Sequence, residues 1–193
     1  VGGPGAANAS GEASYFHENT GRERLLDQMG VWEGDDFSVE AIVRLDSIDA
    51  GASVRTIMSR WGGAKDSVEA YGWSFGVTGE KSRFKPRNLI VQLVGEDENS
   101  NIGYEVVASN LRLPLGHRMH VVAVVSCAEH NVTFYMRDLD APEAPVERMV
   151  VPHAIRGKLG YGNSAVVVGG LNKRATAHQW DGAIEALRLV GGE

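Results

Sequence analysis

The feature that most constrains the fold is a set of short segments in which apolar and polar residues alternate. In the segment FSVEAIVRL, residues 37–45, every odd-numbered residue is apolar, and the even-numbered residues are polar except Ile42. Successive side chains of a strand point to opposite faces of its sheet, so this pattern gathers the odd-numbered side chains on one face. The segment is therefore predicted to be a β-strand with one buried face.

Similar segments recur along the chain and are separated by clusters of Gly, Asp, Asn and Ser, which favour turns. Residues 119–125, MHVVAVV, are apolar on both faces, so we expect a central strand that is covered on each side and paired with 132–137 through the turn SCAEHN. Further strands are expected at RTIMSR (55–60), GWSFGVT (72–78), NLIVQLV (88–94), YEVVAS (104–109), VERMVVP (146–152), SAVVVGG (164–170) and 183–190. About eleven strands with almost no helical periodicity predict an all-β fold, an antiparallel two-sheet β-sandwich.

At most one or two short helices are expected beside these strands. Thr20 and Glu23 have the spacing of a capping box and precede apolar residues, which favours a helix of two or three turns over residues 20–29. Residues 1–10 lack the basic and apolar regions of a signal peptide and are interpreted as a flexible linker or cloning residues. Residues 11–193 are predicted to be a single domain that belongs to a larger protein.

The last expected strand contains a spacing that a regular strand cannot accommodate. Ile184, Leu187 and Leu189 are three and then two residues apart. A strict period of two would bury all three on one face only if one extra residue were inserted between the first two. We therefore predict a β-bulge near Glu185 and Ala186.

The charge balance and the cysteine content exclude several classes of partner and site. A net charge of −6 argues against nucleic acid and anionic membranes as partners, because both select clustered Lys and Arg. The basic residues Lys81, Arg83, Lys85 and Arg87 alternate within an expected loop and are interpreted as a solvated rim. No apolar run reaches the roughly 18 residues needed to cross a bilayer, so no membrane insertion is expected. The single cysteine, Cys127, rules out an internal disulfide and is interpreted as a core or hairpin residue.

Six segments, in their order along the chain, resemble the laminin-G-like domains of the concanavalin A-like lectin and glucanase superfamily. They are GEASYF, FSVEAIVRL, GWSFGV, HRMHVVAVVS with NVTFYM, AVVVGG and WDGAIEALRLV. The resemblance covers nearly the whole chain and implies that residues 11–193 form a concanavalin A-like jelly roll.

The resemblance also bears on metal binding, because some relatives hold a structural calcium with an acidic residue of the last strand. The acid at that place here is Glu185, and Asp181 lies in the turn before the strand. We interpret Asp181 as a turn residue that binds neighbouring backbone groups, with a metal ligand as the alternative. Asp181 and Glu185 are thus weak calcium candidates; no metal site is assigned, and calcium is the one cofactor left open.

Several branches of the superfamily cleave polysaccharides, but the sequence lacks the pattern that this chemistry needs. Hydrolysis uses two carboxyl groups about 5–9 Å apart, which on one strand means a spacing of two or four residues. The strand at 37–45 carries only Glu40 on its polar face, and we interpret it as a surface ion-pair residue. No catalytic residue is assigned, and the chain is predicted not to be an enzyme.

Other polar clusters are also interpreted without a catalytic role. The acidic stretches 35–36 and 96–98, and Asp138 with Asp140, lie in expected loops; solvated charge is favoured there over calcium binding. His117 and His120 are three residues apart, which places them on opposite faces of one strand and argues against a transition-metal site.

A lectin-like site would need an aromatic platform with polar neighbours, and Trp61 is the best candidate for it. Trp61 is expected in a loop beside two glycines, with Arg60 and Lys65 as hydrogen-bond donors. The alternative is that Trp61 folds back and caps the edge of the sandwich, because large aromatic residues contribute heavily to cores.

The other tryptophans are interpreted as structural. Trp73 alternates in phase with Phe75 and is assigned to the core, whereas Trp32 and Trp180 are expected to seal the ends of the sandwich. The residues between and after the core positions are small, and they form a smooth face that could lie under a ligand or another domain: Ser74, Gly76 and Thr78.

Three functions of different classes remain open. We favour a non-catalytic recognition module that binds carbohydrate or a protein surface within a larger secreted or surface bacterial protein. A purely architectural spacer or docking domain ranks second, and a polysaccharide hydrolase ranks third. The expected partners are a glycan or a neighbouring protein domain, and the expected location is extracellular, cell-surface or periplasmic.

Overall fold

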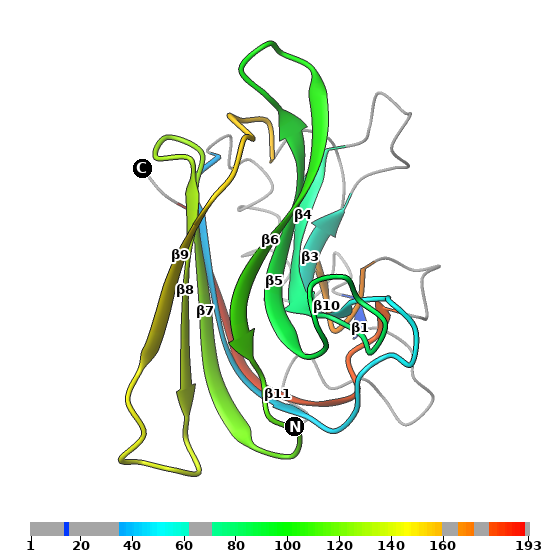
Figure 1. Ribbon diagram of the computed structural model, residues 1–193, viewed down its shortest axis with the longest axis vertical. Helices are drawn as coiled ribbons and strands as arrows, with labels where there is room; N and C mark the ends of the chain where they lie inside the picture. The colour runs from blue at the N-terminus through cyan, green and yellow to red at the C-terminus, as the bar shows by residue number, and fades with distance from the viewer. Residues whose placement is uncertain (1–13, 16–34, 62–70, 160–165, 172–177, 192–193) are drawn as a thin grey trace.

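The strands of this protein form two antiparallel sheets that face each other (Figure 1). The computed structural model describes residues 14–15, 35–61, 71–159, 166–171 and 178–191. The expected linker at 1–10, the expected helix at 20–29, Trp32 and Lys65 lie outside these residues. The described ranges contain no α-helix, and therefore none that could span a bilayer.

Eleven strands are described, in agreement with the sequence prediction. They are β1 (Ser14–Tyr15), β2 (Phe37–Leu45), β3 (Arg55–Trp61), β4 (Gly72–Val77), β5 (Asn88–Glu96), β6 (Ile102–Arg112), β7 (Arg118–Ser126), β8 (Asn131–Asp138), β9 (Glu147–Pro152), β10 (Val166–Val168) and β11 (Gly182–Gly191). One sheet has six strands in the order β1-β10-β3-β4-β5-β6, and the other has five in the order β11-β2-β7-β8-β9. The predicted antiparallel β-sandwich is confirmed.

The core lies between the sheets and contains the side chains that alternate inward along each strand. All five odd-numbered residues of β2 are buried, as predicted, and the even-numbered ones are not. Across the interface the Phe37 ring packs on Trp73 of the other sheet, with ring centroids 4.7 Å apart. Burial of side chains of this size stabilises the fold by roughly 1.5–3 kcal/mol each. Trp180 also belongs to the core, where its indole N–H donates to the carbonyl oxygen of Arg44 at 3.2 Å.

Strand β7 is central in its sheet and pairs with β8 through the turn at 127–130, as predicted. The prediction that both faces of β7 are buried is wrong. Only one face packs against the other sheet, and on the opposite face Val124 is 38% exposed. Valine is favoured in strands because its branched side chain suits a pleated surface, so an apolar run indicates a strand without fixing how many faces are buried. Cys127 is buried in the β7–β8 turn, which confirms its assignment to the core or a hairpin.

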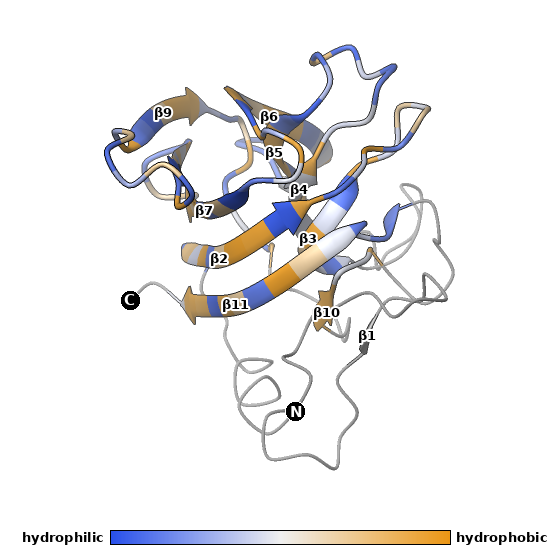
Figure 2. Cartoon of the chain, turned by 90° about the horizontal axis from the view of Figure 1, so that it is seen from below, coloured by the Kyte–Doolittle hydropathy of each residue, from blue (hydrophilic) through white to orange (hydrophobic). Residues whose placement is uncertain are grey.

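The predicted β-bulge in the last strand is confirmed. Ile184 pairs with Val43 and Ala186 pairs with Ile42, so Glu185 has no partner on β2. The extra residue keeps Ile184 and Leu187 on the inner face of the sheet. In Figure 2, β2 and β11 lie side by side, and hydrophilic residues interrupt their hydrophobic stretches.

The first acidic stretch, Asp35 and Asp36, connects the start of β2 to two other segments through hydrogen bonds. Asp36 accepts the backbone N–H of Cys127 at 2.7 Å and the hydroxyl of Ser126 at 2.9 Å, and Asp35 accepts the N–H of Leu159 at 2.8 Å. These carboxylates therefore satisfy backbone donors of two other segments, which is a different role from the solvated charge expected from the sequence.

The loop between β4 and β5 is fixed by two polar residues that are almost fully buried, Thr78 and Asn88. The Thr78 hydroxyl donates to the carbonyl of Lys85 at 2.6 Å and accepts the N–H of Asn88 at 2.9 Å. The Asn88 amide donates to the carbonyl of Phe84 at 2.8 Å, and its oxygen accepts the hydroxyl of Ser109 at 3.2 Å. The loop conformation is thus set by buried hydrogen bonds, which are costly to break.

Deletion of Glu185 tests the bulge. The pairing on either side of Glu185 is already consecutive, so the deletion should remove the bulge without turning any core side chain outward. It also removes an exposed ion pair with Arg118, so we expect the free energy of unfolding to fall by about 1 kcal/mol. Deletion of Glu40, the matched control in β2, should cost more than about 3 kcal/mol because half of that strand must reverse its faces. Equal losses in urea denaturation would contradict the assignment.

Asn88→Ala tests the buried network of the β4–β5 loop. The substitution removes the donor to the Phe84 carbonyl and the acceptor of the Ser109 O–H, so we expect a loss of about 1–3 kcal/mol of unfolding free energy. Asn99→Ala, in the exposed turn between β5 and β6, should change it by less than about 0.5 kcal/mol. A loss of similar size in both variants would show that the network does not hold the loop.

Candidate ligand-binding site on the six-stranded sheet

The outer face of the six-stranded sheet, which points away from the other sheet, carries two aromatic residues in one cross-strand row. Trp61 pairs with Gly72, Gly72 with Val94, and Val94 with Tyr104, so the row runs from β3 to β6. Gly72 has no side chain, and the rings of Trp61 and Tyr104 approach edge to face with centroids 6.2 Å apart. Tyr104 is 44% exposed, so this row presents aromatic surface to solvent.

The next row adds a hydrogen-bonded relay that fixes the polar groups of the face. The hydroxyl of Ser74 donates to the Gln92 side-chain oxygen at 2.8 Å, and the Gln92 amide nitrogen donates to the Tyr104 hydroxyl at 2.6 Å. Tyr104 accepts in this relay, so its own O–H remains free to donate, and Gln92 keeps one further N–H. The relay therefore leaves two oriented donors at the surface.

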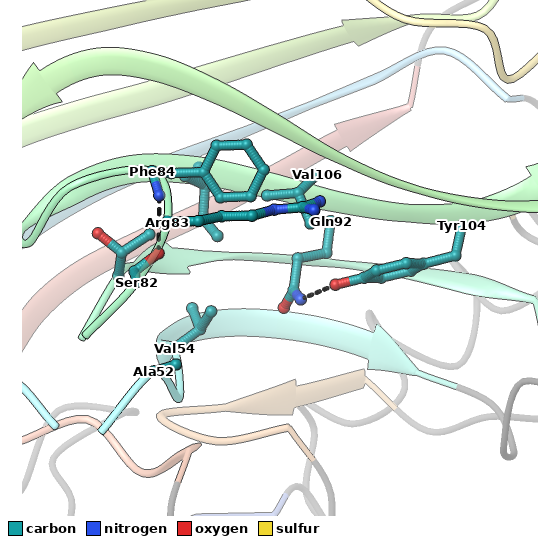
Figure 3. A pocket seen from close by; sticks show the side chains of 10 residues that line it. Ala52, Val54, Ser82, Arg83, Phe84, Gln92, Tyr104 and Val106 are labelled. Carbon is teal, nitrogen blue, oxygen red and sulfur yellow. Dashed lines mark hydrogen bonds between the residues drawn. The ribbon is translucent and has the colours of Figure 1, made fainter. Parts of the chain in front are cut away.

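A hollow with a volume of about 290 Å³, which we call the face hollow, lies beside these donors. The sheet supplies its floor, and the β4–β5 loop and the β2–β3 connection supply its walls. Figure 3 shows Arg83 reaching across the hollow from the loop toward the side of Gln92 and Tyr104. The lining residues are Ala52, Val54, Thr78, Ser82, Arg83, Phe84, Ile90, Gln92, Tyr104 and Val106.

Arg83 and Phe84 bring charge and a second aromatic ring to the face hollow. The guanidinium carbon of Arg83 lies 4.6 Å from the centroid of the Phe84 ring, within the range of a cation–π contact. The backbone of the loop is held by Thr78 and Asn88, so the two side chains project from a fixed support. The face hollow thus combines apolar surface, hydroxyl and amide donors, and one cation. This composition is typical of sites that bind small polar ligands.

The structure separates the three residues that the sequence grouped as a lectin-like site. Trp61 lies at the end of β3 on the outer face. Arg60 pairs with Trp73 on the inner side and is 5% exposed, so its side chain does not accompany Trp61. Neighbouring residues of a strand point to opposite faces, which is why the two separate. Lys65 lies outside the described residues.

The small residues that could lie under a ligand or another domain do stand on the outer face, but they are covered. Ser74 is fully buried beneath Gln92, and Gly76 is closely covered, since a Cβ atom there would lie 2.9 Å from Val54. Thr78 is buried in the floor of the face hollow. These residues support the site, and larger neighbours provide its surface.

The two calcium candidates have separate partners. Glu185 binds Arg118, with 2.6 Å between its carboxylate oxygen and the guanidinium Nε, and Asp181 accepts the hydroxyl of Ser47. The guanidinium group of Arg118 neutralises Glu185 in this arrangement, which is that of an exposed ion pair. The Asp181 carbonyl also accepts the N–H of Asp46 at 2.8 Å, in agreement with its interpretation as a turn residue.

Within the described ranges, one group of side chains has the spacing of metal ligands: His117, Asp138 and Asp140. Protein hydrogen bonds account for each member. His117 contacts Asp138 at 2.7 Å, which lowers the pKa of that carboxyl, and Asp140 accepts the N–H of Arg118 at 2.8 Å. His117 precedes β7, whereas His120 lies on it, so the two histidines do not occupy opposite faces of one strand as predicted.

Glu40 is remote from the face hollow. It lies on β2, in the other sheet, and its carboxylate is 2.7 Å from Nε2 of His120 on β7. This contact agrees with the prediction of a surface ion-pair residue, although its partner is a histidine. The described residues that line the face hollow include no Asp, Glu or His.

Comparisons in sequence identify no relative, since no protein-family profile matches the chain and no curated protein matches it. Solved structures do match. The carbohydrate-binding module CBM40 of the Ruminococcus gnavus IT-sialidase, bound to α2,3-sialyllactose, has a TM-score of 0.57 at 11% identity; the comparison covers 93% of this chain and 86% of that chain. A second structure of that module gives a TM-score of 0.53 with the same identity and coverage.

A phage protein also matches. The enzymatically active domain of tailspike protein 2 from bacteriophage CBA120 has a TM-score of 0.51 at 12% identity, over 82% of this chain and 22% of that chain. At these identities the likeness concerns the fold. The chain shares with them a jelly-roll β-sandwich fold.

Proposed function

We propose that this protein is a non-catalytic carbohydrate-recognition module whose glycan binds on the outer face of the six-stranded sheet. The observation that carries the proposal is the relay from Ser74 through Gln92 to Tyr104, beside the ring of Trp61. A sugar ring has apolar C–H faces and a rim of hydroxyl groups. Exposed aromatic surface suits the former, and fixed donors suit the latter.

The structural comparisons support this proposal. Two of the matching structures are of one carbohydrate-binding module, and in one of them that module is bound to α2,3-sialyllactose. We infer that residues 11–193 act as one laminin-G-like module of a larger protein, and that it works outside the cell, at the cell surface or in the periplasm. The architectural alternative would leave the outer face without a ligand.

A glycan array probed with the purified chain tests the proposal, with three variants as reporters. Tyr104→Phe removes the free O–H donor, and we expect binding to weaken by about two- to ten-fold, the usual range for one hydrogen bond. Trp61→Ala should weaken binding by about ten-fold or more, because it removes aromatic surface next to the sugar. Tyr135→Phe on β8, in the other sheet, is the matched control and should bind like the parent chain.

Thermal melting distinguishes binding from stability. Tyr104→Phe should keep the melting temperature of the parent chain while it loses affinity. If no glycan binds, the architectural alternative is favoured. Reducing ends that accumulate when the bound glycan is incubated with the protein would show that the module is an enzyme.

A further inference from the structure

A second hollow adjoins the face hollow at the open side of the sandwich. It has a volume of about 410 Å³ and lies between the edge strands β6 and β9; we call it the seam hollow. The residues that line it are Arg83, Phe84, Lys85, Asn88, Glu105, Val106, Val107, Ala108, Asn110, Val151 and Pro152. Arg83, Phe84 and Val106 line both hollows, so the two are contiguous.

The junction between the hollows lies over the edge of a sheet. β6 pairs only with β5 among the described strands, so alternate backbone N–H and C=O groups of β6 point away from the sheet. Tyr104 and Val106 line the face hollow from the outer face of β6, whereas Glu105 and Val107 line the seam hollow from its other face. A ligand that occupies both hollows must cross β6 near Val106.

The loop above this junction is strongly basic in a chain of net negative charge. Lys81, Arg83, Lys85 and Arg87 follow one another at intervals of two residues, and the whole chain carries −6. Within the part of the chain that the structure describes, none of these four cations lies within ion-pair distance of a carboxylate. Two of them, Arg83 and Lys85, line the seam hollow.

Two of these cations occupy backbone conformations that favour glycine. Lys85 and Arg87 have φ angles of 68° and 63°, in the left-handed region. A side chain there is strained relative to the ordinary helical region, because Cβ approaches the following carbonyl oxygen. The chain thus has charged side chains at two positions where glycine would be less strained.

One carboxylate faces the same space. Glu105 lines the seam hollow, and its oxygen accepts the N–H of Ala154 at 2.8 Å. That hydrogen bond partly stabilises the negative charge of Glu105. The cations Arg83 and Lys85 line the same hollow. An anionic ligand group would therefore be attracted to the side of the loop and repelled from the side of Glu105.

We propose that the two hollows form one groove for the interior of an acidic polysaccharide chain, which crosses strand β6 beneath Arg83. This inference rests on the proposed carbohydrate function and specifies the ligand. A carboxylate or sulfate group of the chain lies at Arg83, where a guanidinium can donate two parallel hydrogen bonds. The sugar on one side lies against Tyr104 and Gln92, and the sugar on the other side occupies the seam hollow beside Lys85.

Titration calorimetry with three sets of oligosaccharides tests the groove. The acidic probes are galacturonate, mannuronate and chondroitin sulfate oligomers of two, four and six residues, together with any acidic glycan that the array identifies. The neutral controls are carboxyl-reduced galacturonate and mannuronate oligomers and desulfated, carboxyl-reduced chondroitin. For the set that binds, we expect the six-residue oligomer to bind about ten-fold or more tightly than the two-residue oligomer, because it reaches both hollows. Binding should weaken as the salt concentration rises from about 50 mM to about 500 mM.

Two variants and one control locate the charge. Arg83→Gln keeps most of the side-chain length, and we expect it to weaken binding of the acidic oligomer by roughly ten-fold or more. Lys85→Gly removes a charge at a left-handed position, so it should preserve the melting temperature while it weakens binding of the six-residue oligomer. Arg188→Gln, on β11 of the other sheet, changes the net charge equally and should leave binding unchanged.

The outcomes separate this inference from the proposed function. Neutral oligomers that bind as tightly as acidic ones, or an unchanged affinity of Arg83→Gln, would overturn the acidic groove and leave carbohydrate recognition standing. So would α2,3-sialyllactose bound as tightly as any longer chain, because that result indicates recognition of a terminal sugar. Failure of every glycan on the array would remove both proposals.

Discussion

The rest of the structure depends on one constraint: a strand has two faces, and each sheet of this sandwich packs one of them against the other sheet. The inner faces are filled by the core, from Phe37 and Trp73 at the aromatic contact to Phe134. A side chain that meets a ligand must then stand at an outward strand position or in a loop. Trp61, Gln92 and Tyr104 satisfy that condition, and their cross-strand register brings them together although they are far apart in sequence.

The same constraint explains how much of the fold could be predicted from the sequence. Alternation in FSVEAIVRL is a local property, so the buried face of β2 follows from counting residues. The bulge at Glu185 follows from counting as well. Ile184 and Leu187 can share a face only if one residue between them has no partner on the neighbouring strand. The number of buried faces of β7 could not be predicted in this way, because valines such as Val122 and Val124 suit an exposed strand face as well as a buried one.

The site was less accessible to such reasoning. The small residues of β4 and the aromatic ring of Trp61 are visible in the sequence, and both contribute to the outer face. The partnership of Gln92 with Tyr104 depends on the register of β5 and β6 across their turn, and no local pattern fixes that register. The one sequence feature that points to this partnership is the glutamine in the apolar run NLIVQLV, because a polar residue in such a strand needs a hydrogen-bond partner. Arg60 was misplaced for a related reason, since a neighbour in sequence is on the opposite face of a strand.

The β4–β5 loop shows how the sandwich supports a charged site. Left-handed backbone at Lys85 and Arg87 would be populated weakly in a free loop, because each costs about 1–2 kcal/mol there. The buried hydrogen bonds of Thr78 and Asn88 hold the loop from below, and breaking one of them costs a similar amount. The core therefore fixes the backbone that carries the cations before any ligand arrives, so that little backbone entropy is lost on binding. A loop of glycines would reach the same path with less strain, but it would carry no charge to the junction of the two hollows.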